Sequence, residues 1–215
     1  MKGILFDCDG VLVETEPLFA KASMEHLKDY GVDADYSFVT SHNGLKEEIY
    51  LQNLMTEYHI DQDMQIFIEE EHRYLEKFLT EEYIKPMPGI QEFIDWAKEK
   101  YKLGIGTASD MEHIHKILKI IDKEGVFSTI ITGDRVQKGK PDPEVYLKGM
   151  EKLGIKPEET IVIEDSKNGI QAAKNAGAYA IGYKASEIEQ DTSKADFEAY
   201  TYDEIKKHIL EMECE

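Results

Sequence analysis

Cysteine is almost absent from this chain of 215 residues. The only two cysteines, Cys8 and Cys214, lie close to opposite ends of the sequence. Two thiols placed in this way do not supply the disulfide framework that stabilises small secreted domains. We therefore expect a protein of a reducing compartment, and we predict the cytoplasm.

Positive charge and long hydrophobic runs are also scarce. The chain has 25 Lys and Arg residues against 44 Asp and Glu residues, a formal net charge of -19. Nucleic acids and anionic membrane surfaces attract basic proteins, so we expect neither of them as a partner. No apolar stretch approaches the ~18 residues of a membrane-spanning helix, and the N-terminus carries no signal-peptide pattern. A monomer is the default expectation.

Hydrophobic residues nevertheless make up 41% of the chain and gather in short runs separated by helical patterns. The runs are Ile4–Asp7, Leu103–Thr107, Thr129–Thr132, Thr160–Glu164 and Ala178–Gly182, with a weaker one near Ala195–Phe197. Apolar strands that alternate with helices predict an α/β fold: a Rossmann-like parallel sheet with helices on both faces. In one covering helix, Val145, Leu147 and Met150 are predicted to form the apolar face.

One long interval of the chain contains no convincing strand. Helical segments are predicted there at residues 16–30, 45–58 and 63–79. We interpret the interval as a helical cap, residues 15–83, inserted into an α/β core formed by residues 1–14 and 84–215. Lys85–Gly89 is the predicted return linker, and the acidic run Glu69–Glu71 is predicted to lie on a solvated helix face.

Carboxylates follow two of the predicted strands. Asp7 and Asp9 end the first run, and Glu164 and Asp165 end the fourth. The carboxyl ends of parallel strands share one edge of the sheet, where four such carboxylates would repel one another unless a cation were bound. Mg²⁺ suits a site with a few carboxylates and a substrate phosphate. We predict a Mg²⁺ site at these four residues, and direct contact or indirect support by Glu164 are both open.

The same edge of the sheet supplies the groups for phosphoryl transfer. Carboxylates form aspartyl-phosphate intermediates, and beside a metal ion Asp7 can stay ionised as the nucleophile. Asp9 can protonate the leaving oxygen as a general acid and then take a proton from the attacking water. Thr107 and Lys140 can donate hydrogen bonds to the phosphoryl oxygens and spread their charge.

Four segments together resemble the motifs of a known family. DCDGVLVETE, GTAS, GKPDPEVY and IVIEDSKNGI are similar, in order and spacing, to the four motifs of the haloacid dehalogenase-like superfamily. They most resemble the subgroup with a helical cap after the first strand. The resemblance implies that Asp7 is the nucleophile and Asp9 the general acid and base, with its backbone carbonyl as a further metal ligand. It places phosphate or substrate binding at Gly10, Thr107, Ala108, Ser109, Lys140 and, in the cap, Lys46.

The resemblance implies two related activities. The first is a Mg²⁺-dependent phosphatase acting on a small phosphorylated metabolite, such as a sugar phosphate. The alternative is a hexose-phosphate mutase like β-phosphoglucomutase, which uses the same intermediate. Phe19 stands where mutase-like proteins carry a cap histidine, which favours the hydrolase. A dehalogenase would not need Asp9 and the metal carboxylates, and a silent binding module would be expected to have lost part of the set.

His113 and His115 stand two residues apart in a predicted helix. That spacing directs the two side chains to different faces of the helix, which makes them a poor pair of metal ligands. We therefore assign neither histidine to the site.

Overall fold

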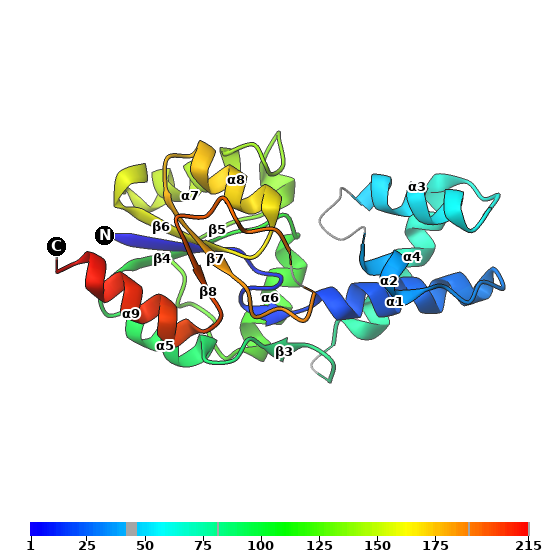
Figure 1. The fold of residues 1–215 in the computed structure, drawn as a ribbon, viewed down its shortest axis with the longest axis horizontal. Helices are drawn as coiled ribbons and strands as arrows, with labels where there is room; N and C mark the ends of the chain where they lie inside the picture. Colours follow the sequence, from blue (N-terminus) through cyan, green and yellow to red (C-terminus); the bar gives the residue numbers. More distant parts are fainter. Residues whose placement is uncertain (42–46, 81, 189, 215) are drawn as a thin grey trace. The chain divides into compact units, whose positions relative to one another are not determined.

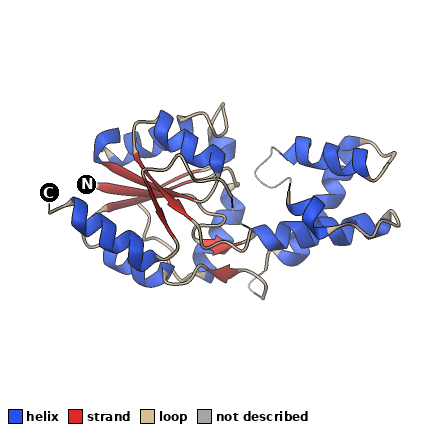
Figure 2. Cartoon of the chain, viewed as in Figure 1, coloured by secondary structure: helices blue, strands red, loops and turns tan. Residues whose placement is uncertain are grey.

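The computed structural model describes residues 1–41, 47–80, 82–188 and 190–214. The chain divides into two compact units, one formed by residues 1–14 and 85–215 and the other by residues 15–84. Figures 1 and 2 show that the first unit is a layered α/β structure and that the second is helical.

The larger unit is built on a six-stranded sheet of order β5-β4-β1-β6-β7-β8, in which every neighbouring pair is parallel. The strands are β1 Gly3–Phe6, β4 Lys102–Gly106, β5 Thr129–Ile131, β6 Thr160–Glu164, β7 Tyr179–Tyr183 and β8 Phe197–Ala199. β1 lies inside the sheet and its side chains are buried on both faces, which explains its uninterrupted apolar run. The predicted α/β class is confirmed.

Helices cover both faces of this sheet, with α7 and α8 on one side and α5 and α9 on the other (Figure 1). The helices are α5 Ile90–Ala97, α6 Met111–Ile120, α7 Glu144–Leu153, α8 Lys167–Asn175 and α9 Tyr202–Met212, with short 3₁₀ helices at Gly133–Arg135 and Pro157–Glu159. α5 buries Ile90, Phe93 and Ile94 almost completely. Burying one such side chain stabilises the fold by about 1.5–3 kcal/mol relative to leaving it exposed. The burial of these side chains therefore holds α5 in the core of its unit.

The predicted apolar face of α7 is partly wrong. Val145 and Met150 are buried as expected, but Leu147 is 43% exposed and Tyr146 is fully buried in its place. The reason lies in β4, where a Cβ at Gly106 would come within 2.9 Å of the Tyr146 ring. The missing side chain of that glycine leaves room for the tyrosine ring, which rotates α7 away from the predicted face.

The two chain connections between the units form a small ribbon. β2, Val13–Glu14, pairs antiparallel with β3, Lys85–Pro86, so the predicted return linker begins as a strand. The Glu14 carboxylate accepts hydrogen bonds from Ser186 Oγ and from the Glu187 backbone N–H, both at 3.0 Å. This carboxylate therefore ties the first connection to the loop that follows β7.

The helical unit contains α1 Glu16–Asp29, α2 Tyr36–Thr40, α3 Glu47–Glu57 and α4 Met64–Phe78. The sequence pattern predicted α1, α3 and α4 but not α2, which is too short to show a helical period. Asp35 caps α2 by accepting a hydrogen bond from the Phe38 backbone N–H at 3.0 Å. Among the residues described, no helix combines the length and apolar character needed to span a membrane.

The acidic run Glu69–Glu71 is not a uniformly solvated face, which corrects the prediction. Glu69 is exposed, but Glu71 is only 3% exposed, because it lies one turn after Phe67 on the side of α4 that packs against α1. Glu71 accepts a hydrogen bond from Ser23 and lies 2.7 Å from His26 Nδ1. Burial disfavours the charged form of His26, but Glu71 and Glu70 raise its pKa above the ordinary value.

Candidate active site

The site residues predicted from the core motifs lie at or just beyond the carboxyl ends of β1, β4 and β6, except Lys140, which lies in the connection between β5 and α7. The Asp7 backbone N–H donates to the Ile163 carbonyl at 3.0 Å, and the Thr107 N–H donates to the Ile131 carbonyl at 3.0 Å. Both residues thus continue the hydrogen bonding of the sheet by one step. This fixes their side chains at one edge of the sheet.

Lys140 lies between two of the carboxylates. Its Nζ donates to Asp7 Oδ1 at 2.7 Å and to Glu164 Oε1 at 2.6 Å, and all three side chains are largely buried. Burial disfavours the lysine charge, but the two carboxylates raise its pKa well above the ordinary value. The ammonium group is therefore charged at neutral pH where it meets Asp7.

Glu164 is held by four donors. Its Oε1 accepts from Lys140 and from the Tyr146 hydroxyl at 2.8 Å, and its Oε2 accepts from the backbone N–H and the hydroxyl of Ser166, both at 3.0 Å. α8 packs so closely beneath it that a Cβ at Gly169 would overlap the carboxylate. These contacts occupy both oxygens and orient the carboxylate toward Lys140.

The carboxylates of Asp7, Glu164 and Asp165 lie close enough to share a cation. One oxygen of each falls within 4.8 Å of the others. Burial, followed by the charges of Glu164 and Asp9, raises the pKa of Asp7 to about 7 although Lys140 opposes the shift. A cluster of oxygen donors with excess negative charge fits a hard divalent ion such as Mg²⁺.

The turn after β1 requires glycine at position 10. Gly10 has a φ of 71°, and a Cβ there would overlap the carboxylate of Asp165. Its N–H donates to the Val13 carbonyl at 2.8 Å, which closes the turn. The first motif therefore packs directly against the acidic residue that follows β6.

The loop after β4 places two hydroxyl groups beside the carboxylates. The Thr107 side chain is buried and its Oγ1 accepts from the Ser109 N–H at 3.1 Å, whereas Ala108 between them is exposed. The Ser109 hydroxyl donates to Asp9 Oδ2 at 2.6 Å. The candidate residue Lys46 lies outside the described residues.

His113 belongs to this cluster, although its spacing from His115 had led us to assign it no role. Its Nε2 lies 3.0 Å from Asp9 Oδ1, and its side chain is 10% exposed. Burial lowers the pKa of the imidazole, but the charge and hydrogen bond of Asp9, together with the charge of Asp110, raise it above the ordinary value. The sequence does contain one indication of this position. Asp110, three residues earlier, is a typical helix-capping residue, and a helix that begins there has His113 in its first turn, beside the sheet edge.

Glu144 holds the loop that carries Lys140. Its Oε2 accepts from the backbone N–H groups of Gln137 at 2.9 Å and Lys138 at 3.0 Å, and its Oε1 pairs with Lys148 at 2.6 Å. The hydrogen bond from Lys148, with those from the two N–H groups, lowers the pKa of Glu144 to about 2. The carboxylate is therefore a fixed anchor for the loop at neutral pH.

Glu144→Ala is expected to lower kcat about tenfold, because a loosened loop misplaces Lys140. In the folded protein the pKa of Glu144 lies below the ordinary glutamate value of about 4.3. The Glu144 carboxylate therefore stabilises the fold above that pH, and this contribution is lost as pH falls toward 2. The difference in melting temperature between wild type and variant should shrink accordingly. Glu151→Ala, an exposed change on the same helix, is the control. An equal loss of activity in both variants would contradict this role.

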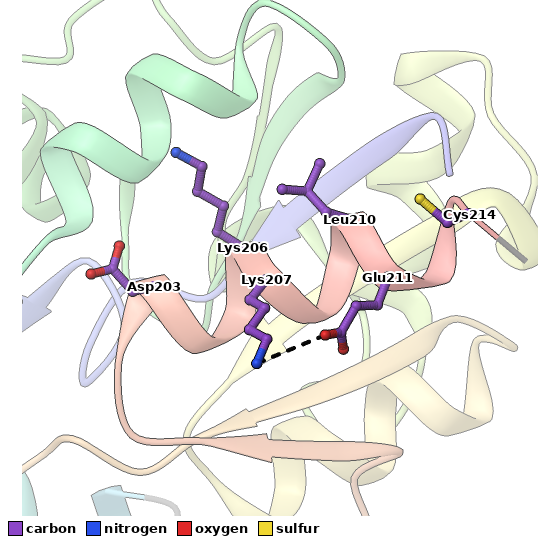
Figure 3. Close-up of a pocket in the computed structure, with 6 residues that line it drawn as sticks. All are labelled: Asp203, Lys206, Lys207, Leu210, Glu211 and Cys214. Carbon is purple, nitrogen blue, oxygen red and sulfur yellow. Dashed lines mark ion pairs between the residues drawn. The ribbon is translucent and has the colours of Figure 1, made fainter.

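A separate surface feature lies along α9 (Figure 3). Figure 3 shows the side chains that line it projecting from this one helix and its end, with an ion pair between Lys207 and Glu211 at 3.9 Å. The lining residues are Asp203, Lys206, Lys207, Leu210, Glu211 and Cys214. None of them belongs to the carboxylate cluster, and a surface drawn from a single helix encloses no ligand, so we assign it no role.

Several known proteins are similar to this chain in sequence and in fold. The sequence profile of the haloacid dehalogenase-like hydrolases matches residues 4–183. A Thermotoga maritima protein named Phosphorylated carbohydrates phosphatase is 35% identical over 178 residues, which cover 82% of each chain. Fructose-1-phosphate phosphatase YqaB of Escherichia coli is 27% identical over 179 residues, covering 83% of this chain and 94% of YqaB. A Thermotoga maritima crystal structure, provisionally named a β-phosphoglucomutase, has a TM-score of 0.81 and 31% identity, covering 98% of this chain and 99% of that one.

The fold and these relatives define an enzyme of the phosphatase class, as the sequence predicted. The family follows from the extent of the match, which runs from Ile4 in β1 to Tyr183 at the end of β7 and covers all of residues 15–84. The chain belongs to the haloacid dehalogenase-like hydrolase family.

Proposed function

We propose that this enzyme hydrolyses small phosphomonoesters, with sugar phosphates as the substrate class, through an aspartyl phosphate on Asp7. The observation that carries the proposal is the placement of Asp7 at the end of β1, in contact with Lys140 Nζ at 2.7 Å and beside the Asp165 carboxylate. A nucleophilic carboxylate needs this setting, because a fixed cation offsets the charge of the approaching phosphate.

Each core motif has a role in this reaction. An Asp7 oxygen attacks phosphorus while Asp9 protonates the departing ester oxygen, so the alcohol leaves neutral. Asp9 then takes a proton from water as the water oxygen attacks phosphorus and the Asp7 carboxylate is released. Lys140 and the Thr107 hydroxyl donate to the phosphoryl oxygens, and the backbone at Gly10, Ala108 and Ser109 completes the phosphate site.

Mg²⁺ would be held by the carboxylates of Asp7 and Asp165 and by the backbone carbonyl of Asp9. When bound, it would neutralise charge on the phosphoryl oxygens and keep Asp7 ionised. Glu164 contributes differently in this proposal, because its two oxygens already accept four hydrogen bonds. Its role is to orient Lys140 rather than to contact the metal.

The substrate class rests on the relatives. Two of them are named for phosphorylated carbohydrates and for fructose 1-phosphate. In this proposal the helical unit, residues 15–84, acts as the cap that selects the substrate, and Lys46 binds a second anionic group of it.

A hexose-phosphate mutase is the second candidate, favoured by the 31% identity to the structure provisionally named a β-phosphoglucomutase. Both reactions share the aspartyl phosphate and differ in the acceptor, which is water or a sugar hydroxyl. Phe19 has no proton to exchange at the position where mutase-like proteins carry a histidine, and this favours water.

The deciding experiment measures phosphate release from a panel of sugar phosphates and other metabolite phosphates, with added Mg²⁺ and with EDTA. Release that requires Mg²⁺ supports the hydrolase, and the ranking of substrates defines the class. Conversion of glucose 1-phosphate to glucose 6-phosphate without phosphate release would support the mutase instead. Release that is unchanged by EDTA would contradict the metal site.

A further inference from the structure

The Asp9 carboxylate is held from both sides by residues that follow β4. Ser109 Oγ donates to Oδ2 at 2.6 Å, and His113 Nε2 lies 3.0 Å from Oδ1. These two residues are 100 and 104 positions away in the chain. Two contacts on different oxygens define the plane of the carboxylate, which a single contact would leave free to rotate.

The start of α6 directs His113 to this position. The Asp110 carboxylate caps the helix by accepting a hydrogen bond from the backbone N–H of His113 itself at 2.8 Å. The imidazole is buried beside Asp9, whereas His115, two residues further along the same helix, is exposed. The fold therefore distinguishes two histidines that the sequence alone treats alike.

We propose that His113 is a positioning residue for Asp9: its imidazole fixes the carboxylate in the orientation that delivers a proton to the leaving oxygen. This inference rests on the proposed function, in which Asp9 is the general acid. Proton transfer in the transition state depends on the placement of the acid and contributes about 10²–10⁴-fold to the rate. Misplacing Asp9 should forfeit part of this factor while Asp7 and Lys140 remain in place.

The leaving group separates this role from a purely structural one. An alkoxide is a poor leaving group and needs the proton of Asp9, whereas 4-nitrophenolate leaves without it. The ratio kcat/KM reports the steps up to the first phosphoryl transfer, and departure of the leaving group is part of that transfer. A positioning role therefore predicts a large loss of kcat/KM for an alkyl phosphate and a small loss for an aryl phosphate.

The experiment compares wild type with three single variants on glycerol 2-phosphate and 4-nitrophenyl phosphate in Mg²⁺. His113→Leu removes the contact to Asp9, and His113→Gln retains an N–H donor near the position of Nε2. His115→Leu is the matched control on the exposed face of the same helix. Circular dichroism checks that each variant is folded, and His113→Asn, whose shorter amide does not reach Asp9, replaces His113→Leu if the latter is unfolded.

We expect His113→Leu to lower kcat/KM about 30- to 100-fold on glycerol 2-phosphate and less than about fivefold on 4-nitrophenyl phosphate. His113→Gln should recover most of the loss, and His115→Leu should match wild type. Equal losses on both substrates, or no loss on either, would overturn the positioning role while leaving the phosphatase intact. If wild type releases phosphate from neither these substrates nor the metabolite panel, the proposed function itself fails, and the role of His113 fails with it.

Discussion

Asp7→Asn is expected to lower phosphate release by at least about 10⁴-fold, because the amide replaces the proposed nucleophile and losses of a nucleophile are of this order or larger. The same substitution leaves the shape of the side chain unchanged. Lys140 keeps its hydrogen bond and ion pair with Glu164, so no buried charge loses its last partner. The measurement is phosphate release under saturating Mg²⁺, and release within tenfold of wild type would contradict the mechanism.

The stability of the Asp7→Asn variant supplies the control for folding. The pKa of Asp7 is raised by burial to about 7 in the folded, metal-free protein, whereas an unfolded aspartate ionises near about 3.9. The folded state therefore binds more protons between these values, and its stability falls as pH rises through that window. The amide does not titrate. The variant should thus gain in melting temperature relative to metal-free wild type as pH rises from about 4 to about 7.

Lys140→Met is expected to lower kcat by about 10³-fold and to destabilise the metal-free fold by about 3–5 kcal/mol. The change removes the proposed donor to the phosphoryl oxygens. It also leaves the Asp7 and Glu164 carboxylates without the cation that lies between them, and breaking a buried pair in this way is costly. Activity is measured as phosphate release and stability by urea denaturation in EDTA.

A double variant separates the two effects of losing Lys140. In Lys140→Met/Glu164→Gln the second change removes one of the two buried charges that the first change leaves uncompensated. We expect stability to recover by at least half and activity to remain lost, because no donor to the phosphate returns. Recovery of activity along with stability would show that Lys140 acts only as a structural counter-ion.

The residues at the carboxyl edge of the parallel sheet could be predicted from the sequence, because each strand shows a local apolar pattern. Apolar runs that end in Asp7, Thr107 or Glu164 are visible without knowledge of the fold, and parallel strands bring their carboxyl ends together. The alternation of strands and helices fixed the α/β class in the same way. Local periodicity also identified the long helices of residues 15–84, although it missed the five-residue α2.

Burial of single side chains was less predictable, because it depends on what packs opposite. Tyr146 replaces Leu147 in the core since Gly106 on β4 leaves room for its ring. Glu71 is buried because Ser23 and His26 on α1 face it with polar atoms. Gly106, Ser23 and His26 all lie far in sequence from the residues that they contact, so helix periodicity alone could not predict the burial of Tyr146 and Glu71.

Motif residues such as Asp7, Asp9 and Lys140 can be recognised in the sequence, and their types suffice to predict phosphoryl transfer. Their contacts and orientations depend on the tertiary structure. It engaged both oxygens of Glu164, so that this carboxylate faces Lys140, and it brought His113 to Asp9 across 104 positions of sequence. The physical reason is that residue type sets which proton, charge or bond a side chain can offer. Its partners, and so its pKa and orientation, come from distant segments that only the folded chain brings together.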